Sequence, residues 1–251
     1  MTSLRSQFNR QIKIIAKENG FLKNKAPYTP EIYFRTTDEL LQVFEFNVYS
    51  FGGADIFFSS LPIRGKITKN SLECAEYPII LSNIAKIPSG CFEYNRKSEE
   101  SIIFCAQTCV ELFEKYILTF FNSATTCESA LKSISNMEYD AYNISPDIEH
   151  SEYNAALYMR IDKLYMALNT KNTEIALECC YAWIEHYKHH LERKDISQDG
   201  IKEIQLGITK YERYIQMLNE ENYVFFDELL DSLEENSRAI ISKVLSTKRR
   251  K

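Results

Sequence analysis

The sequence predicts an α+β protein: an N-terminal antiparallel sheet of three or four strands with covering helices, followed by an all-α four-helix module. Two observations support this. Of the 13 glycines and prolines, ten lie in the first 90 residues, and these residue types form turns and interrupt helices. Apolar residues also recur with period two only in the first third and with helical spacing later. We therefore expect a turn-rich sheet region followed by about 150 mainly helical residues.

The first element predicted is a helix. Leu4, Phe8, Ile12 and Ile15 form a single apolar stripe at helical spacing. Asn19-Gly20 follows, and glycine is the usual residue just after a helix end. We expect this helix to cover one face of the sheet.

Three strands should follow, over residues 31–37, 42–50 and 54–63. In the middle run Phe44, Phe46 and Val48 alternate with Glu45, Asn47 and Tyr49; this alternation predicts a strand with one buried face. Gly52-Gly53 offers a hairpin turn. A short helix near 78–86 and one more strand around 91–94 complete the predicted sheet region.

The remaining elements are helices. Ser98 is an expected N-cap of a long helix reaching about residue 121, and Thr125 or Thr126 an expected cap of a shorter one reaching Ile134. Four further helices are predicted over 151–169, 173–194, 198–219 and 223–246. Their short connections favour antiparallel neighbours in a four-helix bundle, with a repeat solenoid as the alternative.

These elements predict a division of the chain. Residues 1–135 form an α+β domain, 136–150 a linker around Pro146, 151–247 the helical bundle and 248–251 a basic tail. Charge follows the same division, because residues 1–125 have a net charge of +1 and residues 126–247 of −10.

Several features of residues 1–135 resemble a bacterial domain family of unknown function. These are the first helix ending in Gly20-Phe21, the aromatic strands containing Phe34-Arg35, and the aromatic run 116–121 followed by the short helix containing 127–131. The resemblance implies a fold, and it implies no catalytic residue.

Composition and motifs exclude some classes of protein. Seven cysteines without regular spacing fit a reducing cytosol. No apolar stretch approaches the roughly 20 residues of a membrane span, and Met1–Arg10 lacks the apolar core of a signal peptide. No glycine-rich phosphate loop or nucleophile elbow is present. The sequence therefore predicts a cytoplasmic protein without a cofactor.

One cluster of histidines raises the question of a metal. His186 and His190 fall four residues apart on one helical face, a workable spacing for two zinc ligands. Cys179 shares that direction but lies about 10 Å further along the axis. Because the histidines oppose the apolar stripe, the favoured interpretation is a solvated polar face, and Cys179 is expected to be exposed.

A charged cluster on the sheet is the catalytic candidate. Glu45 on the middle strand, with Arg35 and Arg64 on its neighbours, is expected to gather on the open face of the sheet. Cross-strand ion pairs on a solvated face are the favoured alternative.

The acidic half is also rich in tyrosine, with ten of the 16 tyrosines between residues 139 and 223. Tyrosine is enriched at protein interfaces, and an acidic surface favours a basic protein partner and repels nucleic acid. The alternative is that Tyr158, Tyr165, Tyr187 and Tyr214 fill the bundle.

We therefore predict a non-catalytic cytosolic interaction protein, such as a complex subunit or an immunity protein. The rival prediction is an enzyme whose site lies on the sheet or at His186 and His190.

Overall fold

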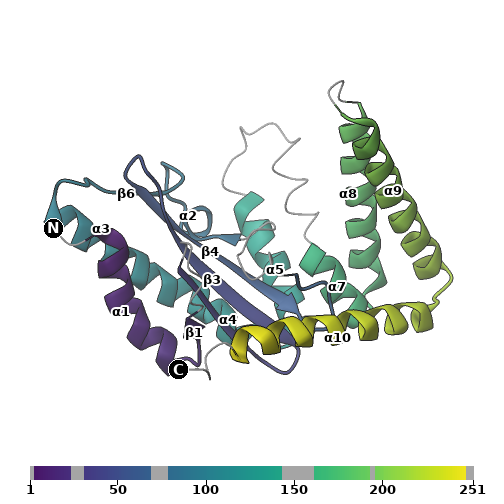
Figure 1. The fold of residues 1–251 in the computed structure, drawn as a ribbon, viewed down its shortest axis with the longest axis horizontal. Helices are drawn as coiled ribbons and strands as arrows, with labels where there is room; N and C mark the ends of the chain where they lie inside the picture. Colours follow the sequence, from purple (N-terminus) through teal and green to yellow (C-terminus); the bar gives the residue numbers. More distant parts are fainter. Residues whose placement is uncertain (1–2, 24–30, 69–78, 143–160, 193–195, 247–251) are drawn as a thin grey trace.

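The computed structural model of the 251-residue chain describes residues 3–23, 31–68, 79–142, 161–192 and 196–246. The architecture is α+β, as predicted (Figure 1). An antiparallel sheet is built from the N-terminal part of the chain, and the C-terminal half is helical. No helix in the described ranges is long and apolar enough to cross a lipid bilayer.

The sheet is centred on the three predicted strands, which pair in sequence order. Its described strands are β1 (Leu22–Lys23), β2 (Glu31–Thr36), β3 (Leu40–Val48), β4 (Gly53–Pro62), β5 (Ile79–Ile80) and β6 (Phe92–Glu93). The order is β1-β2-β3-β4-β5, with β6 also pairing with β4. Gly52, at φ +98°, closes the β3–β4 hairpin, where a positive φ favours glycine.

One face of the sheet packs against helices that flank it in the sequence. They are α1 (Leu4–Glu18), α3 (Glu99–Leu112), the π-helix η2 (Phe113–Leu118) and α4 (Thr119–Ser123). The predicted cap Ser98 is present, because its side chain accepts a hydrogen bond from the backbone N–H of Ser101. Ser3, which the sequence analysis did not name, caps α1 in the same way by accepting from the N–H of Ser6. Phe8 of α1 stacks on Phe46 of β3 at a centroid distance of 3.8 Å, so this face is an aromatic core.

The C-terminal helices are α5 (Cys127–Tyr142), α7 (Ile161–Asn169), α8 (Thr173–Leu191), α9 (Gln198–Asn219) and α10 (Tyr223–Ser246), with the short α2 (Leu81–Ile84) preceding them in the sheet region. The last three helices begin at the predicted positions, whereas α5 runs eight residues beyond its predicted end at Ile134. Residues 136–142 of the predicted linker belong to α5. Residues 143–150 of the linker, the start of the first predicted helix and the basic tail 248–251 lie outside the described residues.

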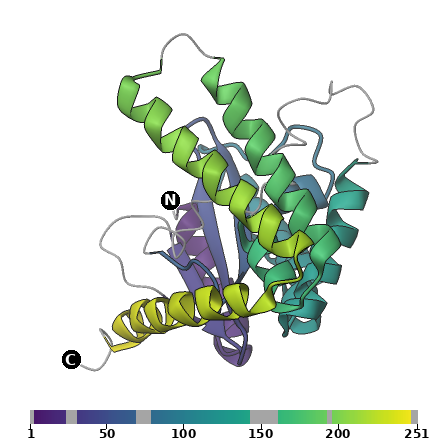
Figure 2. The same ribbon diagram turned by 90° about the vertical axis from the view of Figure 1, so that its right-hand side faces the viewer.

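These helices do not all pack around one axis. Helices α8 and α9 form a long hairpin that stands away from the sheet, and α10 turns back from its base to lie across the sheet (Figures 1 and 2). One continuous core joins residues of both predicted domains, including Ile134, Leu164, Cys180 and Tyr211. The sheet and the helical half are therefore packed as one unit.

Helix α10 changes the expected exposure of the sheet. Its Ile241 packs in a second apolar cluster with Phe34, Leu41, Val43 and Ile63 of the sheet region. These side chains lie on the face opposite α1 and α3. The prediction that β3 has only one buried face is therefore wrong, because a helix distant in sequence covers the other face.

Candidate functional site

The proposed cluster of Glu45, Arg35 and Arg64 does not form. In the β2–β3 register Arg35 lies opposite Gln42, whereas Glu45 lies opposite Ile32. Residues 42 and 45 point to opposite faces of β3 because side chains alternate along a strand. Glu45 is buried on the α10 side, so Arg35 and Glu45 cannot meet at one substrate.

Arg35 instead joins three elements on the α1 side. Its guanidinium donates to Gln42 Oε1 at 2.6 Å, to the Asn19 carbonyl oxygen at 2.9 Å and to Asn122 Oδ1 at 2.9 Å. It also lies 4.6 Å from the centroid of the Phe21 ring. With these contacts Arg35 links the end of α1 to α4, which is a structural role.

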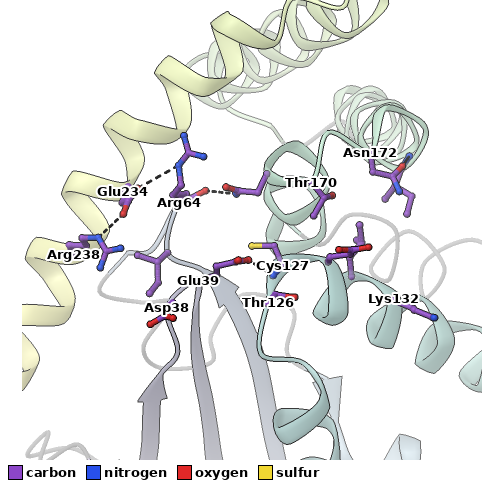
Figure 3. Close-up of a pocket in the computed structure, with 15 residues that line it drawn as sticks. Asp38, Glu39, Arg64, Thr126, Cys127, Lys132, Thr170, Asn172, Glu234 and Arg238 are labelled. Atoms are coloured by element: carbon purple, nitrogen blue, oxygen red, sulfur yellow. Dashed lines mark hydrogen bonds and ion pairs between the residues drawn. The ribbon is translucent and has the colours of Figure 1, made fainter.

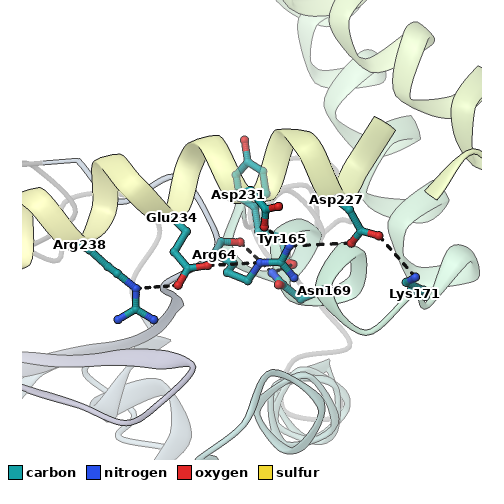
Figure 4. A network of polar contacts seen from close by, with 8 residues as sticks. All are labelled: Arg64, Tyr165, Asn169, Lys171, Asp227, Asp231, Glu234 and Arg238. Carbon is teal, nitrogen blue, oxygen red and sulfur yellow. Dashed lines mark hydrogen bonds and ion pairs between the residues drawn. The ribbon is translucent and has the colours of Figure 1, made fainter. Parts of the chain in front are cut away.

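Arg64 lies beyond the end of β4 and pairs with α10 (Figure 4). Its guanidinium contacts three carboxylates of one α10 face: Asp231, Glu234 at 3.5 Å and Asp227 at 3.9 Å. Asn169 Nδ2 donates to the carbonyl oxygen of Arg64 at 2.8 Å. Arg64 thereby connects the sheet, α7 and α10.

The residues that follow Arg64 also contact α10. Ser237 Oγ donates to the Gly65 carbonyl oxygen at 2.7 Å, and the Ile67 N–H donates to Ser237 Oγ at 3.3 Å. A Cβ at Gly65 would lie 2.9 Å from the Pro62 carbonyl oxygen and 3.2 Å from Tyr165 Cβ. Close packing therefore requires glycine here, and we call this joint, formed by residues 64–67 with Asp227, Asp231, Glu234 and Ser237, the α10 lock.

Beside the α10 lock lies a cavity of about 990 Å³ (Figure 3). It opens between the β2–β3 turn, the start of α5, the α7–α8 turn and α10. Its polar lining residues are Asp38, Glu39, Arg64, Thr126, Cys127, Glu128, Lys132, Asn169, Thr170, Asn172, Glu234 and Arg238. Charges of both signs line this cavity, so its composition favours polar ligands without selecting one charge.

Cys127, the thiol among the described lining residues of this cavity, is unsuited to nucleophilic catalysis. Cys127 begins α5, and its N–H donates to Glu39 Oε2 at 2.7 Å. Burial, together with the Glu39 carboxylate, raises the pKa of the Cys127 thiol to about 12, whereas the thiolate is the reactive form. Glu39 thus occupies the helix N-terminus, and the cavity lining described here contains no histidine that could activate the thiol.

The two candidate metal ligands lie together, as predicted. The ring centroids of His186 and His190 are 4.4 Å apart, and both residues are half-buried on the outer part of α8. Burial, and then the neighbouring His190 and His189, lower the pKa of His186. The expectation for Cys179 is wrong: it is buried in the interface that α8 makes with its neighbours.

Several tyrosines of the helical half lie inside it. Tyr165, Tyr211 and Tyr214 are buried, and the Tyr211 ring stacks on Trp183 at 5.7 Å. Tyr187 is half-buried, and Tyr181 is 52% exposed. Tyr158 lies outside the described residues. Core packing therefore accounts for Tyr165, Tyr211 and Tyr214, three of the six tyrosines of the helical half whose burial is described.

The carboxyl group of Asp55 is buried at the other end of β4, and no sequence pattern predicts this. Asp55 Oδ1 accepts from the N–H groups of Ile56 at 2.8 Å and Ser82 at 3.1 Å, and Ser82 Oγ donates to Asp55 Oδ2. Burial raises the pKa of Asp55 to about 6, although these hydrogen bonds act in the opposite direction. Asp55 anchors the start of α2, and its fully buried position argues against contact with a substrate.

No protein-family model, curated protein or solved structure matches the chain. The resemblance of residues 1–135 to a bacterial family stays a prediction. Within the described ranges, no group of three or more histidine, cysteine, aspartate or glutamate side chains is placed to hold a metal ion. The geometry of the chain itself is therefore the basis for a functional proposal.

Proposed function

We propose that the chain is a non-catalytic cytoplasmic interaction protein, an accessory subunit or immunity-type protein, that docks a basic protein partner on α10. The observation that carries the proposal is the charge of α10 and the turn before it. Residues 220–235 contain seven acidic residues and no basic residue. Such a segment attracts a basic surface at long range and repels phosphate.

Part of this acidity faces solvent on one side of the helix. Val224, Glu228, Asp231 and Glu235 are exposed, and their spacing of four, three and four residues places them on one face. We call these four residues the acidic face. Val224, which is 68% exposed, adds an apolar contact to it.

The position of the acidic face suits docking. Helix α10 is attached to the sheet by Ile241 and by the α10 lock, so two separate contacts hold it against the sheet. Tyr165, Tyr211 and Tyr214 are buried and cannot reach a partner, so charge, rather than tyrosine, is the feature that selects the partner.

A cytoplasmic location is supported by the cysteines. Cys91, Cys105, Cys109, Cys127 and Cys180 are buried free thiols. Persistent free thiols, two of them one helical turn apart at residues 105 and 109, are typical of a reducing compartment.

Charge reversal tests the proposal. The double variant E228K/E235K changes two exposed residues and leaves the three carboxylates around Arg64 in place. The matched control E178K/E185K makes the same charge change at the same seven-residue spacing on exposed positions of α8. Each chain would carry a photo-cross-linker at position 224, and cross-linked partners would be compared in native lysate at low salt and at 1 M NaCl.

We expect the unaltered chain and the control to cross-link the same basic protein at low salt. At 1 M NaCl the screening length falls to about 3 Å, and both should lose it. The E228K/E235K variant should lose it at either salt concentration. Equal cross-linking by both double variants, or an acidic cross-linked partner, would contradict the proposal.

A further inference from the structure

The outer part of α8 carries two imidazoles that the proposed function does not use. His186 and His190 are four residues apart on this helix, and their ring centroids are separated by 4.4 Å. Side chains at this spacing lie one above the other on a helix face. Both residues are half-buried, so they reach solvent while part of each packs on the helix.

We infer that His186 and His190 together bind a divalent transition-metal cation of the zinc, nickel and copper class. Imidazole nitrogens suit these ions, whereas magnesium and calcium prefer oxygen ligands. The inference rests on this pair alone and is independent of docking on the acidic face.

His189 has a different environment and serves as a comparison. Its ring is 75% exposed, and its Nδ1 lies 3.5 Å from Glu192 Oε2. It is one residue from His190 and so points about 100° away from it around the helix. His189 therefore shares the sequence cluster without belonging to the proposed pair.

The number of protein ligands decides whether a metal site is closed or open to exchange. The described residues supply no group of three metal ligands, and a closed structural zinc site requires four. Two imidazoles leave the other coordination positions to water or to a group from another molecule. The site is consequently an exchangeable surface chelate at the outer part of the α8–α9 hairpin.

The chain contains its own reporter for such binding. Trp183 is the single tryptophan, and its ring centroid lies 5.9 Å from that of His186. Copper and nickel ions quench a nearby indole, whereas zinc, with a filled d shell, should compete for the site without quenching. Trp183 fluorescence during titration with CuCl₂ or NiCl₂ therefore measures occupancy at this position.

We expect saturable quenching by copper and nickel, reversed by zinc and absent with magnesium. His190→Ala is the main variant because it leaves the contact between Trp183 and His186 unchanged. Even changes outside the ligand set cost about 10–100-fold in metal affinity, so H190A and H186Q should each weaken binding at least about tenfold. H189A should bind as the unaltered chain does.

A second measurement separates metal binding from folding. Zinc should raise the Tm of the unaltered chain and of H189A, because a ligand bound only to the native state stabilises it. It should leave the Tm of H190A unchanged. Absence of copper quenching in the unaltered chain, or an affinity that is the same in H190A, would overturn the inference. A loss in H189A as large as that in H190A would also overturn it.

Discussion

The two faces of the sheet are covered in different ways. On one face aromatic side chains dominate: the Phe44 ring lies 4.6 Å from that of Phe113, 4.8 Å from Tyr33 and 5.2 Å from Phe21. On the other face α10 contributes Ile241 and the partly buried Ile240 to a small apolar cluster, and the α10 lock supplies ion pairs. The first face is held mainly by apolar burial, and the second combines apolar burial with charge.

The two faces of the sheet differ in the interactions that stabilise them. The aromatic face buries large rings, which are a major source of folding free energy. The α10 face uses carboxylates that also belong to the acidic surface of the protein, because Asp231 contacts Arg64 and remains largely exposed. Salt and charge changes should therefore affect α10 much more than the aromatic face, and this expectation can be tested.

The largest effect should follow from removing a ring of the aromatic face. Phe44→Ala leaves a cavity among Tyr33, Phe113 and Phe21, and such truncations cost about 3–5 kcal/mol. Urea denaturation followed by circular dichroism should show this loss equally at low and high salt. The control Phe44→Leu, which removes less volume, should cost less than half as much. A salt-dependent loss would contradict the comparison.

The second-largest effect should be a pH dependence of stability caused by Asp55. This buried carboxyl group lies at the end of β4 that is away from the α10 lock. Its pKa is raised from 3.8 to about 6, so the folded state binds a proton more readily than the unfolded state. This contribution to stability is fully present below about pH 4 and is lost as pH rises through 6. At about 1.4 kcal/mol per pKa unit, the pH-dependent contribution is on the order of 2–3 kcal/mol.

Proton counting explains why the protonated form fits. Ser82 Oγ carries one proton and faces two acceptors, Asp55 Oδ2 and the Gly90 carbonyl oxygen. A protonated Asp55 donates to Ser82, which then donates to Gly90. The amide introduced by the variant Asp55→Asn can make the same pattern at every pH. The stability of the unaltered chain minus that of D55N should therefore rise between pH 7 and pH 4, and a pH-independent difference would refute this account.

How far the sequence predicts such features depends on whether the signal is local. The stripe Leu4, Phe8 and Ile12 and the cap Ser98 depend on neighbours within a few residues, and they are buried or capped as predicted. The burial of Glu45 depends on residues that only the folded chain brings together. Alternation along β3 identifies two faces, and it contains no information about a helix nearly 200 residues later.

The candidate site shows the same limit. Arg64 and Asp231 are 167 residues apart in the sequence, and Asp55 and Ser82 are 27 apart. Surface carboxylates are abundant, so neither pairing stands out from composition. The sequence does contain one signal for the acidic helix face, because residues 220–235 lack any basic residue. It contains no signal that Arg64 pairs with this face.

A smaller effect should follow from shortening the apolar contact of α10. Ile241 is 7% exposed and packs at the border of its cluster, so Ile241→Ala should cost about 2 kcal/mol, the lower end for such truncations. Hydrogen exchange should show faster exchange of α10 amides and unchanged exchange in α1 and α3. Exchange that accelerates equally in all three helices would mean that the two faces unfold together.

The smallest effect, and the one most specific to charge, should come from the α10 lock. Arg64→Met keeps the aliphatic length and leaves Asp227, Asp231 and Glu234 without their shared cation. Half-exposed ion pairs contribute little each, so we expect a loss of about 1 kcal/mol at low salt. At 1 M NaCl the screening length is about 3 Å, and the difference between the variant and the unaltered chain should shrink. Arg238→Met removes a cation that pairs with one described carboxylate, that of Glu234, and serves as the control with a weaker effect. If R64M costs as much at 1 M NaCl as at low salt, Arg64 acts by packing and not by charge, and the distinction between the two faces would reduce to the size of their apolar clusters.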